Sequence, residues 1–184
     1  MTKIVPLAVK KNKFGERVAD ISVTDYYAQI MEEVLEAHAE YVSNVIYDKL
    51  NGAKIIGDDD NEVTELVDVI TCCVTRIDII GIENYSINSL DEYPQDFYNA
   101  LSRKVLKAFE KALAAEEVPQ GGFKGTVGHR MIYRKEFEEL RKIISLCIKR
   151  LEQLGYDSDK RQKFYQAVNE KNRKRGYFKV KKTP

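Results

Sequence analysis

The stretch TELVDVITCCVTRIDIIG, residues 64–81, decides the fold class of this protein. Its apolar residues recur every three or four positions, which is the spacing of an α-helix, and Gly81 is a typical helix stop. Apolar residues also occur on the side that carries Glu65 and Asp68, so we expect this helix to lie at the centre of a bundle. Two carboxylates one turn apart repel each other. Where a buried helix begins its apolar run, they need a group that compensates their negative charge.

Four other segments show helical spacing, and we find no convincing strand pattern. We expect helices over residues 23–50, 62–80, 95–117, 133–154 and 158–174, loops over residues 51–61 and 119–129, and an irregular segment over residues 1–20. The predicted fold class is all-α, with a single domain over residues 1–184 built as a bundle of about five helices.

Short polar residues and glycines mark the ends of these helices. Ser22 or Thr24 can cap the first helix and Asp157 or Ser158 the last, because their side-chain oxygens accept backbone N–H bonds. The glycines that follow three of the helices are Gly81, Gly155 and Gly176. We expect them to end those helices.

The composition is that of an ordinary soluble domain, with 43% hydrophobic and 32% charged residues among 184. Charges interrupt every apolar run and no secretory signal is recognisable, so we expect a cytoplasmic protein without a membrane partner. The cysteines, Cys72, Cys73 and Cys147, lack a CxxC spacing and are expected to be reduced thiols in the core. His38 lies on the apolar side of its helix, where we expect a packed histidine and not a metal ligand.

Acidic and basic residues separate along the chain, although the net charge is only +1. Residues 25–68 hold twelve Asp or Glu against two Lys or Arg, whereas residues 160–182 hold ten Lys or Arg against one Glu. Such a split is typical of two separate partners, or of one ligand with a cationic and an anionic part held between the two regions. A complex of a metal ion with a phosphate is a ligand of the second kind.

Carboxylates at helical spacing occur on two of the predicted helices. Glu33, Glu36 and Glu40 share one face of the first helix, and Glu65 and Asp68 are one turn apart on the second. If the two helices face each other, these groups need a cation to neutralise them where the dielectric constant is low. Carboxylate oxygens suit Mg²⁺, and bundles build metal sites from inward carboxylates.

The same spacing also occurs on a helix face that is exposed to solvent, and most glutamates on helices lie on such a face. Glu32, Glu62 and the three aspartates at 58–60 are expected to be surface charges of that kind. The glycine-rich segment 119–129 lacks the GxxxxGK[ST] pattern of a phosphate-binding loop, so we expect a passive surface loop there.

Two motifs resemble a known family. The stretches MEEVLEAHAE, residues 31–40, and TELVDVITCC, residues 64–73, are similar to the paired ExxE and ExxD motifs of the MazG-like all-α nucleoside triphosphate pyrophosphohydrolases, in the dimeric dUTPase/MazG superfamily. The motifs stand on successive predicted helices with 28 residues between them. Their acidic residues are Glu33, Glu36, Glu65 and Asp68.

The resemblance extends to the basic end of the chain. NEKNRKRGYF, residues 169–178, is similar to the basic segment found near the end of many family members. The resemblance covers mainly residues 25–82 and 165–178, whereas residues 83–160 form a helical insertion that departs from a minimal member. Ala37 stands where a Leu often follows the first motif. The departures leave the substrate pocket and the oligomer interface outside the match.

The family resemblance implies hydrolysis of a nucleoside triphosphate, in the first place a dNTP, to the monophosphate and pyrophosphate. It implies a Mg²⁺ site, for which Mn²⁺ is an alternative ion, with four ligands: Glu33, Glu36, Glu65 and Asp68. Glu33 and Glu36 are also the candidate catalytic residues, because one glutamate can accept the proton of the attacking water. The residues implied to bind the substrate lie in or next to the basic tail, residues 171–184: Lys171, Asn172 and Arg175. A homodimer or homotetramer is implied as well.

A second interpretation is a non-enzymatic helical protein that binds nucleic acid or another anion through its basic C-terminal segment. Aromatic residues interleave with the charges there, as in proteins that stack on bases: Phe164, Tyr165, Tyr177 and Phe178. The chain has no motif that reads a nucleic-acid groove, so we rank this interpretation second and do not expect a nucleic-acid partner. A third interpretation is a structural module whose helices only assemble.

Overall fold

A computed structural model describes residues 4, 6–7, 10–11, 17–18, 21–51, 59–83, 85–87, 94–117 and 127–177 of the chain. Its helices are α1 (Val23–Asn51), α2 (Asp59–Ile79), α3 (Phe97–Glu116), α4 (Val127–Gln153) and α5 (Ser158–Lys174). A two-residue strand pair, β1 (Lys10–Lys11) with β2 (Arg17–Val18), precedes them. The all-α fold class is confirmed. The strand pair lies in a segment that the sequence predicts to be irregular or extended.

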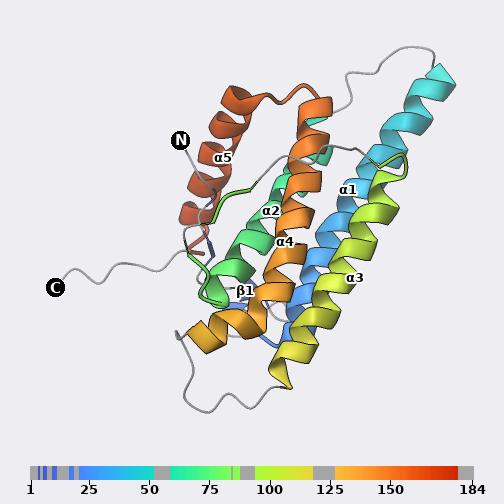
Figure 1. Ribbon diagram of the computed structural model, residues 1–184. Helices are drawn as coiled ribbons and strands as arrows, with labels where there is room; N and C mark the ends of the chain where they lie inside the picture. Colours follow the sequence, from blue (N-terminus) through green and yellow to red (C-terminus); the bar gives the residue numbers. More distant parts are fainter. Residues whose placement is uncertain are drawn as a thin grey trace.

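The first four helices form a bundle. α1 packs against α2 and α3, and α4 packs against the same two helices, so α1 and α4 occupy opposite corners (Figure 1). This arrangement places the seam between α1 and α2 on one side of the bundle and the seam between α3 and α4 on the other. Within the described ranges, no helix is long and apolar enough to cross a membrane.

Two helices begin earlier than the apolar pattern predicts. α2 begins at Asp59 and not at residue 62, which fits the preference of carboxylates for the positive end of a helix dipole. α4 begins at Val127 and not at residue 133, so the last part of the predicted glycine-rich loop is helical. Met131 is 70% exposed, and Tyr133 is the first buried side chain of α4 among those whose burial the structure describes. The rest of the two predicted loops, 52–58 and 119–126, lies outside the described residues.

The predicted caps and stops hold their helices as expected. Ser22 accepts the backbone N–H of Asp25 at 3.0 Å, and Asp157 accepts that of Lys160 at 2.9 Å. Gly155 has a φ of 84°, a left-handed conformation that favours glycine. Its own N–H and that of Tyr156 turn back to the last carbonyls of α4. The glycines at 81 and 176 close α2 and α5 with the same pair of bonds, at φ values of 69° and 74°.

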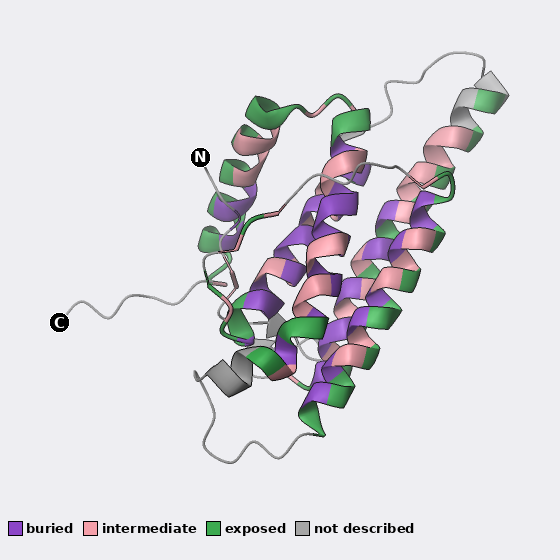
Figure 2. Cartoon of the chain, viewed as in Figure 1, coloured by how far each residue is buried: buried purple, intermediate pink, exposed green. Residues whose placement is uncertain are grey.

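α2 is buried on more than one side, as its sequence predicts. The residues of its predicted stripe that are buried are Val63, Leu66, Val67, Ile70 and Ile77, and Val74 is partly buried. Val69, which lies on the side of Glu65 and Asp68, is also fully buried. Figure 2 shows that buried residues line the inner sides of the four bundled helices. The carboxylates of α2 therefore stand on a helix that neighbouring helices hold in place.

Two buried Arg–Glu pairs tie α2 to α4. Glu136 accepts bonds from Arg76 Nε at 2.7 Å and from the Tyr27 hydroxyl at 2.8 Å. Glu62 accepts bonds from Arg150 Nε at 2.7 Å and from the Tyr98 hydroxyl at 2.6 Å. Each pair therefore joins three helices, since Tyr27 belongs to α1 and Tyr98 to α3.

The prediction that Glu62 is a surface charge is wrong. Its side chain is 2% exposed, because the guanidinium of Arg150 and the hydroxyl of Tyr98 replace the water that a carboxylate needs. The partner stands 88 positions away along the chain, beyond the reach of a helical pattern. Glu32 is exposed, as predicted, whereas the side chains of the aspartates at 58–60 lie outside the described residues.

The predictions for cysteine and histidine agree with the packing. Cys73 and Cys147 are buried, Cys72 is half-buried, and all three are free thiols. His38 is half-buried and stacks on Tyr98, with ring centroids 4.7 Å apart. These side chains contribute to packing, and His38 is not in the carboxylate cluster described next.

Candidate metal centre

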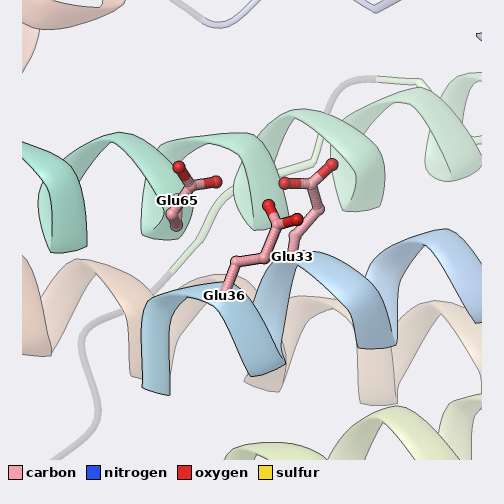
Figure 3. Close-up of side chains that lie close together, drawn as sticks. All are labelled: Glu33, Glu36 and Glu65. Atoms are coloured by element: carbon pink, nitrogen blue, oxygen red, sulfur yellow. The ribbon is translucent and has the colours of Figure 1, made fainter. Parts of the chain in front are cut away.

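A cluster of carboxylates lies between α1 and α2. Glu33 and Glu36 project from α1 toward α2, and Glu65 projects from α2 into the same space (Figure 3). One carboxylate oxygen of each residue lies within 4.8 Å of the others. The ExxE spacing puts the first two on one face of α1, and the packing of α1 on α2 supplies the third. The structure therefore brings together three of the four predicted ligands in this group.

Glu33 is the most perturbed member of the cluster. Burial and the negative charges of Asp68, Glu36 and Glu65 raise its pKa from 4.5 to about 8. A hydrogen bond between the carboxyl groups of Glu33 and Glu65 adds to the effect, because one group must hold a proton to donate it. Burial and the charges of Asp68 and Glu36 raise the pKa of Glu65 as well. At neutral pH the cluster therefore holds at least one proton that a cation can replace.

Asp68 stands beside the cluster. It is not one of the three residues within 4.8 Å of one another, but its charge raises the pKa of both Glu33 and Glu65. Its own pKa is raised by burial, while the positive charges of Lys171 and Arg175 act in the opposite direction. The fourth carboxylate thus lies between the acidic cluster and the basic end of α5.

The basic end of α5 lies near α2, although more than 100 residues separate Asp68 from Lys171. Lys171 and Arg175 are exposed, and they follow each other by one turn of helix. Asn172 is only 7% exposed and belongs to the packed side of α5 with Val168 and Asn169. Lys171 and Arg175 are therefore exposed to solvent near Asp68, whereas the Asn172 side chain is mostly enclosed by protein.

One neighbour of the cluster escaped the sequence analysis. Cys72 follows Asp68 by one turn, and the charges of Glu33 and Asp68 help to raise the pKa of its thiol after burial, the main cause. The hydroxyl of Tyr26 donates a bond to the backbone carbonyl of Cys72 at 2.8 Å. Because Cys72 follows Asp68 at i, i+4, the sequence places both on one face of the helix, and this spacing could have identified Cys72 as a neighbour of the site. Its raised pKa makes it an inert thiol.

The donor set suits a hard divalent cation. All three clustered donors are carboxylate oxygens, and such ions prefer oxygen ligands. Two oxygens on opposite sides of one Mg²⁺ ion are about 4.2 Å apart, and about 5 Å apart around Ca²⁺. The three carboxylate oxygens, within 4.8 Å of one another, are close enough for one such ion to lie among them. A cation would also offset the mutual repulsion that raises the pKa of Glu33.

Comparisons of the chain with protein-family models, with curated proteins and with solved structures found no match.

Proposed function

We propose that this protein hydrolyses a nucleoside triphosphate, with a dNTP as the first candidate, to the monophosphate and pyrophosphate in a reaction that depends on Mg²⁺. One observation carries the proposal. The ExxE and ExxD motifs of the MazG-like resemblance supply a carboxylate cluster between α1 and α2 with Asp68 beside it, and the cationic side chains of Lys171 and Arg175 stand near Asp68. Acidic and basic groups at one place suit a metal–triphosphate complex.

The proposed ligands of Mg²⁺ are Glu33, Glu36, Glu65 and Asp68, and Mn²⁺ is an alternative ion. When bound, the ion would neutralise phosphate charge and lower the pKa of a water molecule. The bond between the α- and β-phosphates must break to release pyrophosphate, and we propose that the water attacks the α-phosphorus with pyrophosphate as the leaving group.

The chain supplies charge and proton transfer around that step. Lys171 and Arg175 would bind phosphate oxygens, Lys as a point charge and Arg through two parallel bonds. Glu33 and Glu36 are the candidates to accept the proton of the attacking water, since both project into the space between α1 and α2 (Figure 3). Asn172 is proposed only as a supporting residue, because little of its side chain is exposed.

The test is a panel of the eight common nucleoside triphosphates plus dUTP, each with Mg²⁺, with monophosphate and pyrophosphate measured by chromatography. We expect at least one nucleotide to be hydrolysed, and Glu36→Gln and Asp68→Asn to lose most of the activity. Glu32→Gln is the matched control, because Glu32 is exposed on the same helix outside the cluster. Turnover of no nucleotide, or equal turnover by all four proteins, would refute the proposal.

The anion-binding interpretation is less well supported. It treats the basic segment as an independent surface, whereas Lys171 and Arg175 stand near Asp68. A homodimer or homotetramer, a cytoplasmic location and the absence of a membrane partner remain parts of the proposal.

A further inference from the structure

A row of lysines covers the seam between α3 and α4, on the side of the bundle away from the carboxylate cluster. We call this surface the lysine face. It consists of Lys104, Lys107 and Lys111 on α3 and Lys135, Lys142 and Lys149 on α4. The α3 lysines follow an i, i+3, i+7 spacing and the α4 lysines a spacing of seven, so each set follows one line along its helix. Figure 1 shows α3 and α4 side by side.

A buried carboxylate organises the middle of the lysine face. Glu139 is 5% exposed, and Lys142 Nζ lies 2.8 Å from its Oε1. Lys107 Nζ lies 3.7 Å from the same oxygen, and Lys104 Nζ lies 3.7 Å from Oε2. The ammonium groups of Lys107 and Lys142 are therefore no more than about 6.5 Å apart, because they share an oxygen at 3.7 and 2.8 Å.

Glu139 is ionised in this position. Burial alone would raise its pKa, but the bond from Lys142 and the charges of Lys104 and Lys107 lower it. One negative charge cannot neutralise three positive ones. The excess remains accessible, because the side chains of Lys107 and Lys142 are 51% and 43% exposed. The pairing thus concentrates positive charge and fixes its position.

The remaining lysines extend this charge along the seam. Lys135 and Lys149 are 14 residues apart on α4, a distance of about 21 Å along the helix axis. Lys135 is exposed and Lys149 is partly exposed. Glu110 offsets part of the charge, at 3.4 Å from Lys111. Glu138 lies one turn from both Lys135 and Lys142, so six lysines stand against three carboxylates and the face keeps a net positive charge.

The chemistry of the lysine face fits a phosphate backbone. A duplex carries one phosphate per about 3.4 Å of each strand, so the α4 line spans roughly six phosphates. Lysines bind phosphate as point charges and read no base sequence. Among the described residues on this line, Met131 is the exposed large apolar side chain. One such residue is too little to insert into a bilayer.

We propose that the lysine face binds duplex nucleic acid through the phosphate backbone, without sequence preference. The proposal does not depend on the hydrolase activity, because the face and the carboxylate cluster lie on different seams of the bundle.

The test is fluorescence anisotropy with a labelled 20-base-pair duplex of arbitrary sequence at 50 and 200 mM salt. The test variant is Lys107→Gln/Lys111→Gln/Lys135→Gln, which leaves Lys104 and Lys142 paired with Glu139. We expect it to weaken binding at least tenfold at 50 mM salt and to reduce the slope of log K against log salt by about 2.7. An unchanged melting temperature and helical circular-dichroism spectrum of the variant would show that it is folded.

The matched control is Lys160→Gln/Lys163→Gln/Lys174→Gln on α5, which removes the same charge elsewhere and should change affinity less than twofold. Wild-type protein that fails to bind at 50 mM salt overturns the proposal, as does an equal loss of affinity in the control. A third arm uses vesicles containing phosphatidylserine. Binding to these vesicles without binding to the duplex would also overturn it, in favour of a membrane surface.

Discussion

Replacing Glu33 with glutamine should make the metal-free protein more stable at neutral pH, although it removes a proposed metal ligand. The carboxyl group of Glu33 stands among three other carboxylates, and its pKa is about 8 in the folded protein against an ordinary value of 4.5. An amide of the same shape carries no charge and avoids the repulsion. If the protein becomes more stable when a metal-coordinating carboxylate is removed, the carboxylates are held close together to bind a cation and not to stabilise the fold.

The magnitude follows from the proton balance. Below pH 4.5 the group is protonated in both the folded and the unfolded chain, and stability does not depend on it. As the pH rises to 8, the unfolded chain releases the proton and the folded chain keeps it, so the wild-type protein loses stability. At pH 7 the loss is at most about 3 kcal/mol, from 1.36 kcal/mol for each of roughly 2.5 pH units above the unfolded pKa.

Solvent screening reduces this limit, since Glu33 is only partly buried. We therefore expect Glu33→Gln to gain about 1 to 3 kcal/mol at pH 7, or about 2 to 12 °C in melting temperature. The assay is thermal unfolding in EDTA at pH 5, 6, 7 and 8. The gain should grow with pH, and adding Mg²⁺ should stabilise the wild-type protein more than the variant.

Glu136→Gln is the matched control, because it makes the same chemical change at a glutamate that is paired. Glu136 is buried between Arg76 and the hydroxyl of Tyr27, so the substitution should cost about 3 kcal/mol or more. The reasoning about Glu33 is refuted if Glu33→Gln melts below the wild type at pH 7, or if their difference is the same at pH 5 and pH 8.

Further predictions concern the proton, the ion pairs, a helix stop and the thiols. With a pKa of about 8 for Glu33, Mg²⁺ binding at pH 7 should release about 0.9 proton, measured by calorimetry in two buffers; release below about 0.3 would contradict the site. Replacing Arg76 with Met should cost about 3 to 5 kcal/mol in denaturant unfolding, and joint replacement of Arg76 and Glu136 by apolar residues should recover much of it. Gly155→Ala should cost about 1 to 2 kcal/mol because of its positive φ, and a neutral result would exclude that reason. Cys73 and Cys147, whose pKa values burial raises, should resist iodoacetamide at pH 8 until the chain unfolds; modification of the native protein within minutes would contradict their burial.

The local features of this fold were accessible from the sequence because their causes are local. Apolar spacing marked the helices, and the glycines at 81, 155 and 176 marked three ends, since a left-handed residue closes a helix with its own neighbours. The pattern failed at the start of α4, where the exposed Met131 does not continue the buried stripe that begins with Tyr133. The i, i+3 spacing of the motifs placed Glu33 with Glu36 and Glu65 with Asp68 on single helix faces.

Other features depend on which helices pack together, and no spacing within one helix contains that information. Glu62 has the same local appearance as Glu32, yet Arg150 of α4 makes it a buried partner. Glu139 and the lysines around it come from two helices that only packing joins. The charges of these residues were visible in the sequence. A carboxylate forms an ion pair, repels a neighbouring carboxylate or remains in water according to its burial and to the distance and sign of the nearest charge. The tertiary structure sets all three.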